Sequence, residues 1–256
     1  MMRCERIGWM VLLAVAGTLI PLPAAAYTPK VTAHGALVRW HDARVEIRID
    51  PSSERLLAPE QVRRALTIAT EAWRGLPGVP DLVVAPGEPG PAGHDPVVGP
   101  TNGIYVPDPW PYDPRRLAVT VTTYDAHTGR LLDTDVFINP EMPFDLLPED
   151  EDRPRDRYDL ASVLAHELGH VLGLDETDVP DATMGPEISR GEVHQRTLEP
   201  DDENGAIALY HDAMLDTETA GVGCGGANVA GALTSRGAPA AAVTVGWLLI
   251  WLRRRC

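Results

Sequence analysis

The sequence predicts an α/β (α+β) domain, and three patterns carry this prediction. The range Ala43 to Asp50 alternates apolar and polar residues, which is typical of a strand with one buried face. Two further strand-like segments, Leu117–Tyr124 and Arg130–Asn139, flank the turn-rich Asp125–Gly129 and predict an antiparallel hairpin. The range Pro59 to Arg74 is predicted to be a helix with one apolar stripe, made of Val62, Ala65, Leu66, Ala69 and Trp73.

Shorter segments fill the rest of this layout. Asp81–Ala85 and Gly103–Val106 read as short strands, and Pro86–Pro100 between them is rich in Pro and Gly and predicts a loop. Glu149–Asp159 is a charged stretch that also predicts a loop with a solvated surface. Its acids offer oxygen ligands for calcium, but they lack the regular spacing of a calcium-binding loop.

The segment from His166 to Glu176 has the spacing of a zinc site that includes its own base. His166 and His170 are four residues apart, so they share one face of a helix with about 6 Å between Cβ atoms. Glu167 places a carboxylate where it can take a proton from a metal-bound water. Gly173 allows a sharp turn after the helix, which brings a third ligand, Glu176, back to the metal.

This pattern, HExxHxxGxx followed by a ligand, resembles the metzincin metallopeptidases and, within them, the matrixins. The similarity continues through Glu176–Pro186, which matches the run from the third ligand to the Met-turn at Met184, and into Arg196–Asp202 and Gly205–Tyr210. Tyr158–Ala165 is similar to the lead-in to the active-site helix. The resemblance implies a twisted mixed sheet with two long helices, a Met-turn subdomain and a final helix near Asp201–Asp212.

One residue departs from the family pattern. Position 176 is expected to be His in a matrixin, or Asp in some other metzincins, and here it is Glu. Two His and one Glu form a known catalytic zinc set, but the carboxylate lowers the net positive charge and makes the bound water less acidic. The alternatives are a solvated Glu176 with two protein ligands, or Asp175 or His194 as the third ligand.

The ends of the chain predict export. Arg3 and Arg6 precede the apolar run Ile7–Leu22 and the small residues Ala24–Ala26, which together read as a secretory signal over residues 1–26 with cleavage before Tyr27. A retained membrane anchor is the alternative.

We expect the metallopeptidase domain at 27–214, a Gly/Ala-rich linker with Cys224 at 215–237, and a hydrophobic segment with a basic end at 238–256. The order of Cys224, apolar run and Arg253–Arg255 resembles myxobacterial C-terminal sorting signals, which implies transient membrane association and a sorting enzyme. The alternative is an amphiphilic tail without a sorting role.

The net charge bears on the class of partner, and the positions of the cysteines bear on disulfide bonding. Residues 27–223 carry a formal net charge of −20, which argues against nucleic acid as a partner. Cys4, Cys224 and Cys256 all lie outside the predicted catalytic domain, so no disulfide holds it together.

The resemblance also assigns a substrate-binding edge strand above the zinc. By position, Leu117, Ala118, Val119 and Thr120 correspond to the edge that pairs with an extended polypeptide substrate. An ordinary hairpin is the alternative.

Together these features predict an exported zinc-dependent endopeptidase, on the cell surface or secreted, with Glu167 as general base, Met184 as the floor of the site and zinc held by His166, His170 and Glu176. A catalytically inactive binding module with the same fold is the competing hypothesis.

Overall fold

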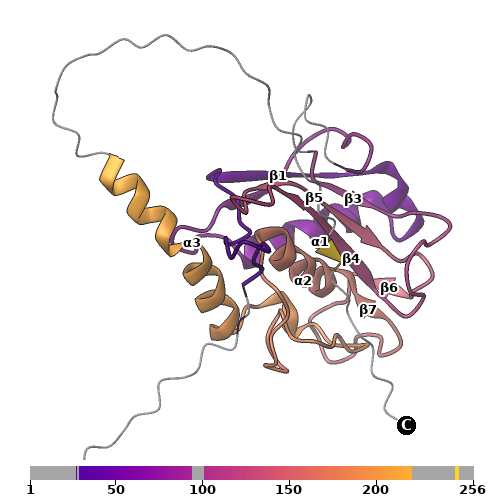
Figure 1. The fold of residues 1–256 in the computed structure, drawn as a ribbon. Coiled ribbons are helices and arrows are strands. Elements are labelled where there is room, and N and C mark those ends of the chain that lie inside the picture. The colour runs from indigo at the N-terminus through magenta and orange to yellow at the C-terminus, as the bar shows by residue number, and fades with distance from the viewer. Residues whose placement is uncertain (1–26, 28, 94–100, 221–245, 248–256) are drawn as a thin grey trace, which may run out of the picture.

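The computed structural model describes residues 27, 29–93, 101–220 and 246–247. One mixed sheet forms the upper layer, with helices beneath it (Figure 1). The elements are β1 (Arg44–Ile49), η1 (Pro51–Arg55), α1 (Pro59–Ala72), β2 (Asp81–Val84), β3 (Gly103–Tyr105), β4 (Ala118–Tyr124), β5 (Leu131–Ile138), β6 (Phe144–Asp145), β7 (Tyr158–Asp159), α2 (Leu160–Leu172), η2 (His194–Arg196), α3 (Pro200–Ala220) and β8 (Gly246–Trp247).

The main sheet has the order β2-β1-β3-β5-β4-β8. Strands β2, β1, β3 and β5 are mutually parallel, whereas β4 is antiparallel to β5 and to β8. The predicted α/β class with a mixed sheet is therefore confirmed. The turn between β4 and β5 is held by Asp125, whose carboxylate accepts the backbone N–H groups of His127 and Thr128 in a typical Asx turn. The turn residues that separate the two strands in the sequence therefore form the predicted turn.

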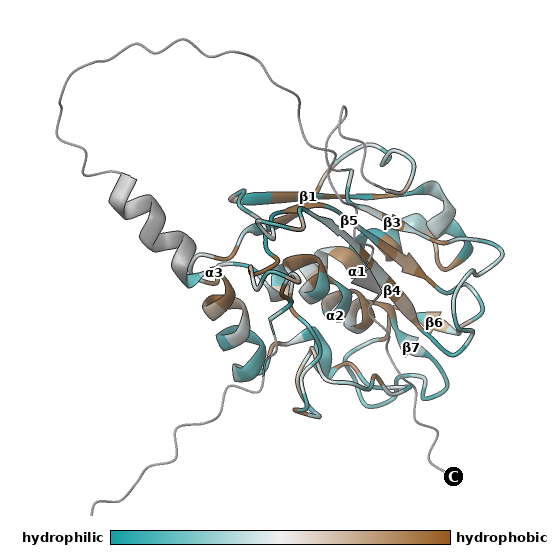
Figure 2. Cartoon of the chain, viewed as in Figure 1, coloured by the Kyte–Doolittle hydropathy of each residue, from teal (hydrophilic) through white to brown (hydrophobic). Residues whose placement is uncertain are grey.

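The two long helices α1 and α2 pack together on one face of the sheet. The predicted stripe of α1 is buried, and the indole of Trp73 just beyond the helix donates from Nε1 to the backbone oxygen of Ala165 in α2, at 2.9 Å. Brown, apolar segments meet between sheet and helices in Figure 2. Burial of these side chains contributes most of the stability of the fold.

Helix α2 is buried along its whole length. It begins at the cap residue Asp159, whose Oδ2 accepts the backbone N–H of Ser162 at 2.8 Å. Asp159 is also paired with Arg196 of η2 and has no exposed surface. The prediction of a solvated loop up to Asp159 was therefore wrong at its last residues, because the carboxylate closes the helix and pairs with a distant arginine.

The opposite face of the sheet carries a pair of buried acids on β5. Asp133 Oδ1 accepts the backbone N–H of Thr101 at 2.9 Å, and Asp135 accepts those of Gly103 and Gly93 on its two oxygens. These bonds hold Gly93 and Thr101, in the connection between β2 and β3, and the start of β3 against the two acids. The part of this predicted loop at 94–100 lies outside the described residues.

The final helix α3 starts at Pro200, as the resemblance implied, and continues to Ala220, beyond the domain end predicted at 214. Tyr210 joins it to α2 by donating its hydroxyl to the backbone oxygen of Leu172 at 2.7 Å. The predicted signal at 1–26 and most of the predicted linker and tail lie outside the described residues. Within the part of the chain that is described, no helix is both long and apolar enough to cross a membrane.

Candidate metal centre

Helix α2 presents the motif residues, and its end directs the chain back toward them. Gly173 ends the helix with φ at +98°, in the left-handed region that glycine adopts without strain. A Cβ at this position would also overlap the backbone oxygen of Val38. The helix therefore stops at the point where the N-terminal segment crosses it, and the chain turns toward Glu176.

This turn brings the three predicted ligands together. One ligand atom from each of His166, His170 and Glu176 lies within 4.8 Å of the others. Both histidine Nε2 atoms and Glu176 Oε1 are buried and have no hydrogen-bond partner. Buried polar atoms are normally paired, so three unpaired ones that face one another fit a bound cation.

The backbone sets which histidine nitrogen faces the centre. Nδ1 of His166 lies 2.8 Å from the carbonyl oxygen of Thr183, and Nδ1 of His170 lies 3.0 Å from that of Leu174. A carbonyl oxygen only accepts, so each Nδ1 carries the proton and each Nε2 keeps its lone pair for a metal. This donor set, two imidazoles and a carboxylate, is one that zinc prefers.

Electrostatics favour the metal-binding form of the histidines. Burial lowers the pKa of His166 to about 4, and burial together with the neighbouring His166 lowers the pKa of His170 well below its usual value. Both rings are thus neutral at pH 7, as zinc ligands must be.

The pKa values of the two glutamates are shifted upward. Burial raises the pKa of Glu176 to about 7; Asp175 adds to this shift, and Arg116 opposes it. Burial likewise raises the pKa of Glu167 to about 7, against the effects of Thr120 and Arg116. Arg116 is buried two residues before β4 begins and places a cation near both acids, a role that the sequence did not predict.

Glu167 projects from α2 toward β4. Its Oε2 accepts a hydrogen bond from the Thr120 hydroxyl at 2.5 Å, while its Oε1 is buried without a partner. Leu117 to Thr120 were predicted as the substrate edge, and all four are buried. Beyond them, Val121 and Thr122 pair on the outer side of β4 with β8, so this edge accepts an extended segment.

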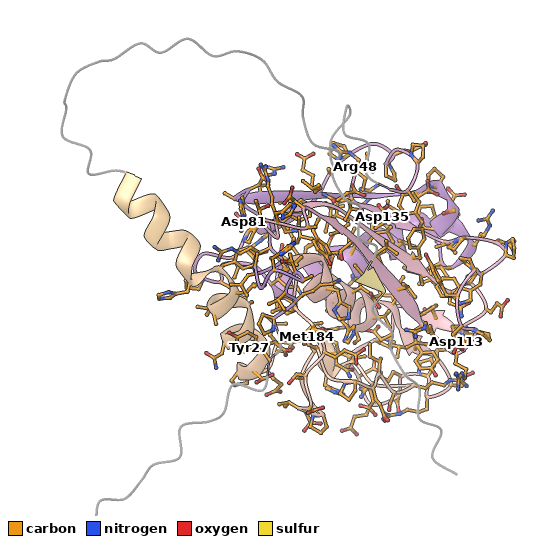
Figure 3. All side chains as sticks on the ribbon, viewed as in Figure 1. Tyr27, Arg48, Asp81, Asp113, Asp135 and Met184 are labelled. Atoms are coloured by element: carbon orange, nitrogen blue, oxygen red, sulfur yellow. The ribbon has the colours of Figure 1, made fainter. Side chains whose placement is uncertain are left out.

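Met184 lies beneath α2, where Figure 3 labels it. A Cβ on Gly169 would overlap its sulfur, so the turn packs directly against the motif helix. Asp202 holds this turn, a role that the sequence did not predict. From the first turn of α3, its carboxylate accepts the backbone N–H groups of Thr183 and Met184 at 2.8 and 2.9 Å. An acid just after the start of a predicted helix was the available signal.

The alternative ligands lie elsewhere. Asp175 accepts the backbone N–H of Glu176 at 3.0 Å, and His194 is in η2 beside Glu192. Among the described residues, the cluster of His166, His170 and Glu176 is the one group of three or more His, Cys, Asp or Glu with metal-binding geometry, so the acids of Glu149–Asp159 form no such group.

Comparison with known proteins agrees with this geometry. Residues 114–211 match the Matrixin family model. Metalloendoproteinase 4-MMP of Arabidopsis thaliana is 32% identical over 181 residues, which cover 67% of this chain and 48% of that protein. Metalloendoproteinase 5-MMP of the same plant is 48% identical over 52 residues, or 20% of this chain and 14% of the relative. The chain thus spans about half the length of the first relative. The segment that carries the three candidate ligands is thus similar to the matrixins.

Proposed function

We propose that this chain is an exported endopeptidase that hydrolyses polypeptides with one zinc ion held by His166, His170 and Glu176. The observation that carries the proposal is the set of three buried, unpaired ligand atoms within 4.8 Å of one another. A helix that buries such atoms without a ligand loses hydrogen bonds to water and gains nothing in return.

The chain's own residues perform the proton transfers. Bound zinc supplies a Lewis acid that polarises the scissile carbonyl and acidifies the attacking water. Glu167 accepts the proton that this water loses as its oxygen attacks the carbonyl carbon. It then gives that proton to the amine nitrogen as the C–N bond breaks. Met184 forms an apolar floor below the ligands.

An extended peptide is the substrate class that fits the strand arrangement. The antiparallel pairing of β8 with Val121 and Thr122 supports main-chain hydrogen bonding along the outer side of β4. On this basis, Leu117 to Thr120 form the adjacent part of the substrate edge.

The test is proteolysis of an unfolded protein. The purified protein is expected to cleave casein, to lose activity on chelation and to regain it with zinc. The competing function, an inactive binding module, is motivated by the unusual Glu176. Elemental analysis separates the two, because a module without catalysis is expected to purify with far less than one zinc per chain. Casein cleavage that chelators leave unchanged would contradict the proposal.

Export is the second part of the proposal and rests on the two ends of the sequence. The signal at 1–26 directs secretion, and the tail with Cys224 and Arg253–Arg255 implies transient membrane association and processing by a sorting enzyme. Mass spectrometry of the mature protein is expected to give an N-terminus near Tyr27 and a C-terminus near Cys224. Intact Met1 or Cys256 in the extracellular fraction would contradict the respective step.

A further inference from the structure

Thr120 occupies an unusual place for a residue of a substrate edge. Its hydroxyl lies on the helix-facing side of β4, 2.5 Å from Oε2 of Glu167 and 3.4 Å from the backbone oxygen of the same residue. The side chain is 1% exposed. The hydroxyl therefore hydrogen-bonds to Glu167 and not to solvent or to a peptide.

The strand holds this hydroxyl in a fixed position. Thr120 is paired with Val136 in the antiparallel ladder between β4 and β5, which fixes its backbone. A β-branched side chain also has few χ1 choices, so the hydroxyl direction follows from the backbone. Glu167 has the opposite situation, because a glutamate has three rotatable bonds and needs an external contact to stay in one rotamer.

The contact makes the two oxygens of Glu167 unequal. Oε2 is occupied by Thr120, whereas Oε1 is buried and has no partner within the described chain. We propose that Thr120 is a positioning residue, which anchors Glu167 through Oε2 and leaves Oε1 as the oxygen that meets the attacking water. This inference rests on the endopeptidase function proposed above, and it assigns a side-chain role to a residue expected to act through its backbone.

The kinetic test uses a series at this position in the full-length protein. Thr120→Val keeps the shape and removes the hydroxyl, so kcat on a peptide substrate should fall about tenfold with a small change in KM. Thr120→Ser keeps the hydroxyl and should stay within about threefold of the parent. If Thr120→Val keeps the parent kcat, or if Thr120→Ser loses as much as Thr120→Val, the proposal is overturned.

Thr134→Val is the matched control. Thr134 has the same burial and lies opposite Thr122 in the ladder between β4 and β5, but its hydroxyl donates to the side-chain oxygen of Asn102 at 3.2 Å and does not contact Glu167. Its removal should leave kcat within about twofold. An equal loss of kcat in both Val variants would show a general effect of strand packing and would contradict the positioning role.

A second readout needs neither zinc nor substrate. In the metal-free protein, Thr120→Val should lower the melting temperature in the parent background but not in Glu167→Ala, where the partner is absent. Equal shifts in both backgrounds would refute the contact. If the parent binds zinc but hydrolyses no peptide, the endopeptidase proposal fails. The melting temperatures of the parent, the two single variants and the double variant still decide whether Thr120 holds Glu167.

Discussion

Two pairs of acids lie on opposite sides of the main sheet, three of them buried and Glu176 half-buried, and they differ in how their oxygens are used. On the helix side, burial raises the pKa of Glu167 and Glu176 to about 7. On the other side, burial and the neighbouring Asp133 raise the pKa of Asp135 to about 7 as well. The pKa values alone therefore do not tell a functional acid from a structural one.

The hydrogen bonds of the carboxylate oxygens do distinguish the functional acids from the structural ones. Both oxygens of Asp135 accept backbone N–H groups, from Gly103 at 3.1 Å and Gly93 at 2.5 Å. Glu167 and Glu176 each keep one buried oxygen without a partner. An acid with both oxygens filled by its own chain fixes a loop, whereas an acid with one open oxygen is available to a ligand.

Neutralising one acid on each face tests this difference most directly. Glu167→Gln should lower kcat by about 10²–10⁴-fold, because the amide cannot take the proton from the attacking water. Asp135→Asn, an equally small change at an acid with a similar pKa, should leave kcat nearly unchanged. Steady-state kinetics on one peptide, with zinc content measured for both, checks this pair. Similar losses of kcat in the two variants would remove the distinction.

The second test concerns Glu176 as a ligand. Glu176→Ala should weaken zinc binding by more than the roughly 10–100-fold that loss of an outer contact costs, because the metal loses a direct ligand. Glu176→His should keep zinc and retain or raise activity. Competition with a chromophoric chelator gives both affinities. Parent-like zinc affinity in the Ala variant would assign the third position to another group.

Arg116 is the cation whose charge acts on both open carboxylates. Arg116→Gln removes the charge that opposes the rise in the pKa of Glu176, so this ligand should hold its proton to higher pH. Zinc affinity near pH 6 should then fall by up to about tenfold and recover toward pH 8, since zinc binds the deprotonated carboxylate. Arg115→Gln is the control, because the exposed Arg115 pairs with Asp113. Equal effects of the two substitutions would exclude a local role for Arg116.

Asp135 should also make the stability of the protein depend on pH, by a smaller amount. Its pKa is about 7 in the folded protein and 3.8 for an ordinary aspartate, so the folded state binds more protons between these values. The free energy of unfolding then falls as pH rises from about 4 to 7. Asp135→Asn removes this contribution, so its free energy of unfolding relative to the parent should rise by about 1 kcal/mol, or roughly 2–4 °C in melting temperature, between pH 6 and 8. Thermal melts at both pH values measure it; a constant difference would contradict the assignment.

The sequence predicted those features that depend on local pattern. Periodicity located β1, α1 and the β4–β5 hairpin, and the motif with Gly173 predicted that Glu176 returns to the two histidines. The structure brings these three residues together.

The contacts that support the site were not predictable in this way. Asp159 with Arg196, Asp202 with the Met-turn and Thr120 with Glu167 each join residues far apart in the chain, and no period or spacing marks such pairs. Asp133 and Asp135 left one usable signal, since two acids at alternate positions of an apolar strand require partners on one face.

The glycines of the motif have a consequence for engineering. Gly169 leaves room for the Met184 sulfur, and Gly173 leaves room for the Val38 carbonyl while its own oxygen accepts the backbone N–H of Lys30 at 3.4 Å. A graft of residues 160–176 onto a foreign helix would carry every ligand but neither neighbour. The transplanted turn after the helix would then have no surface to follow, so Glu176 would sample many positions around the two histidines.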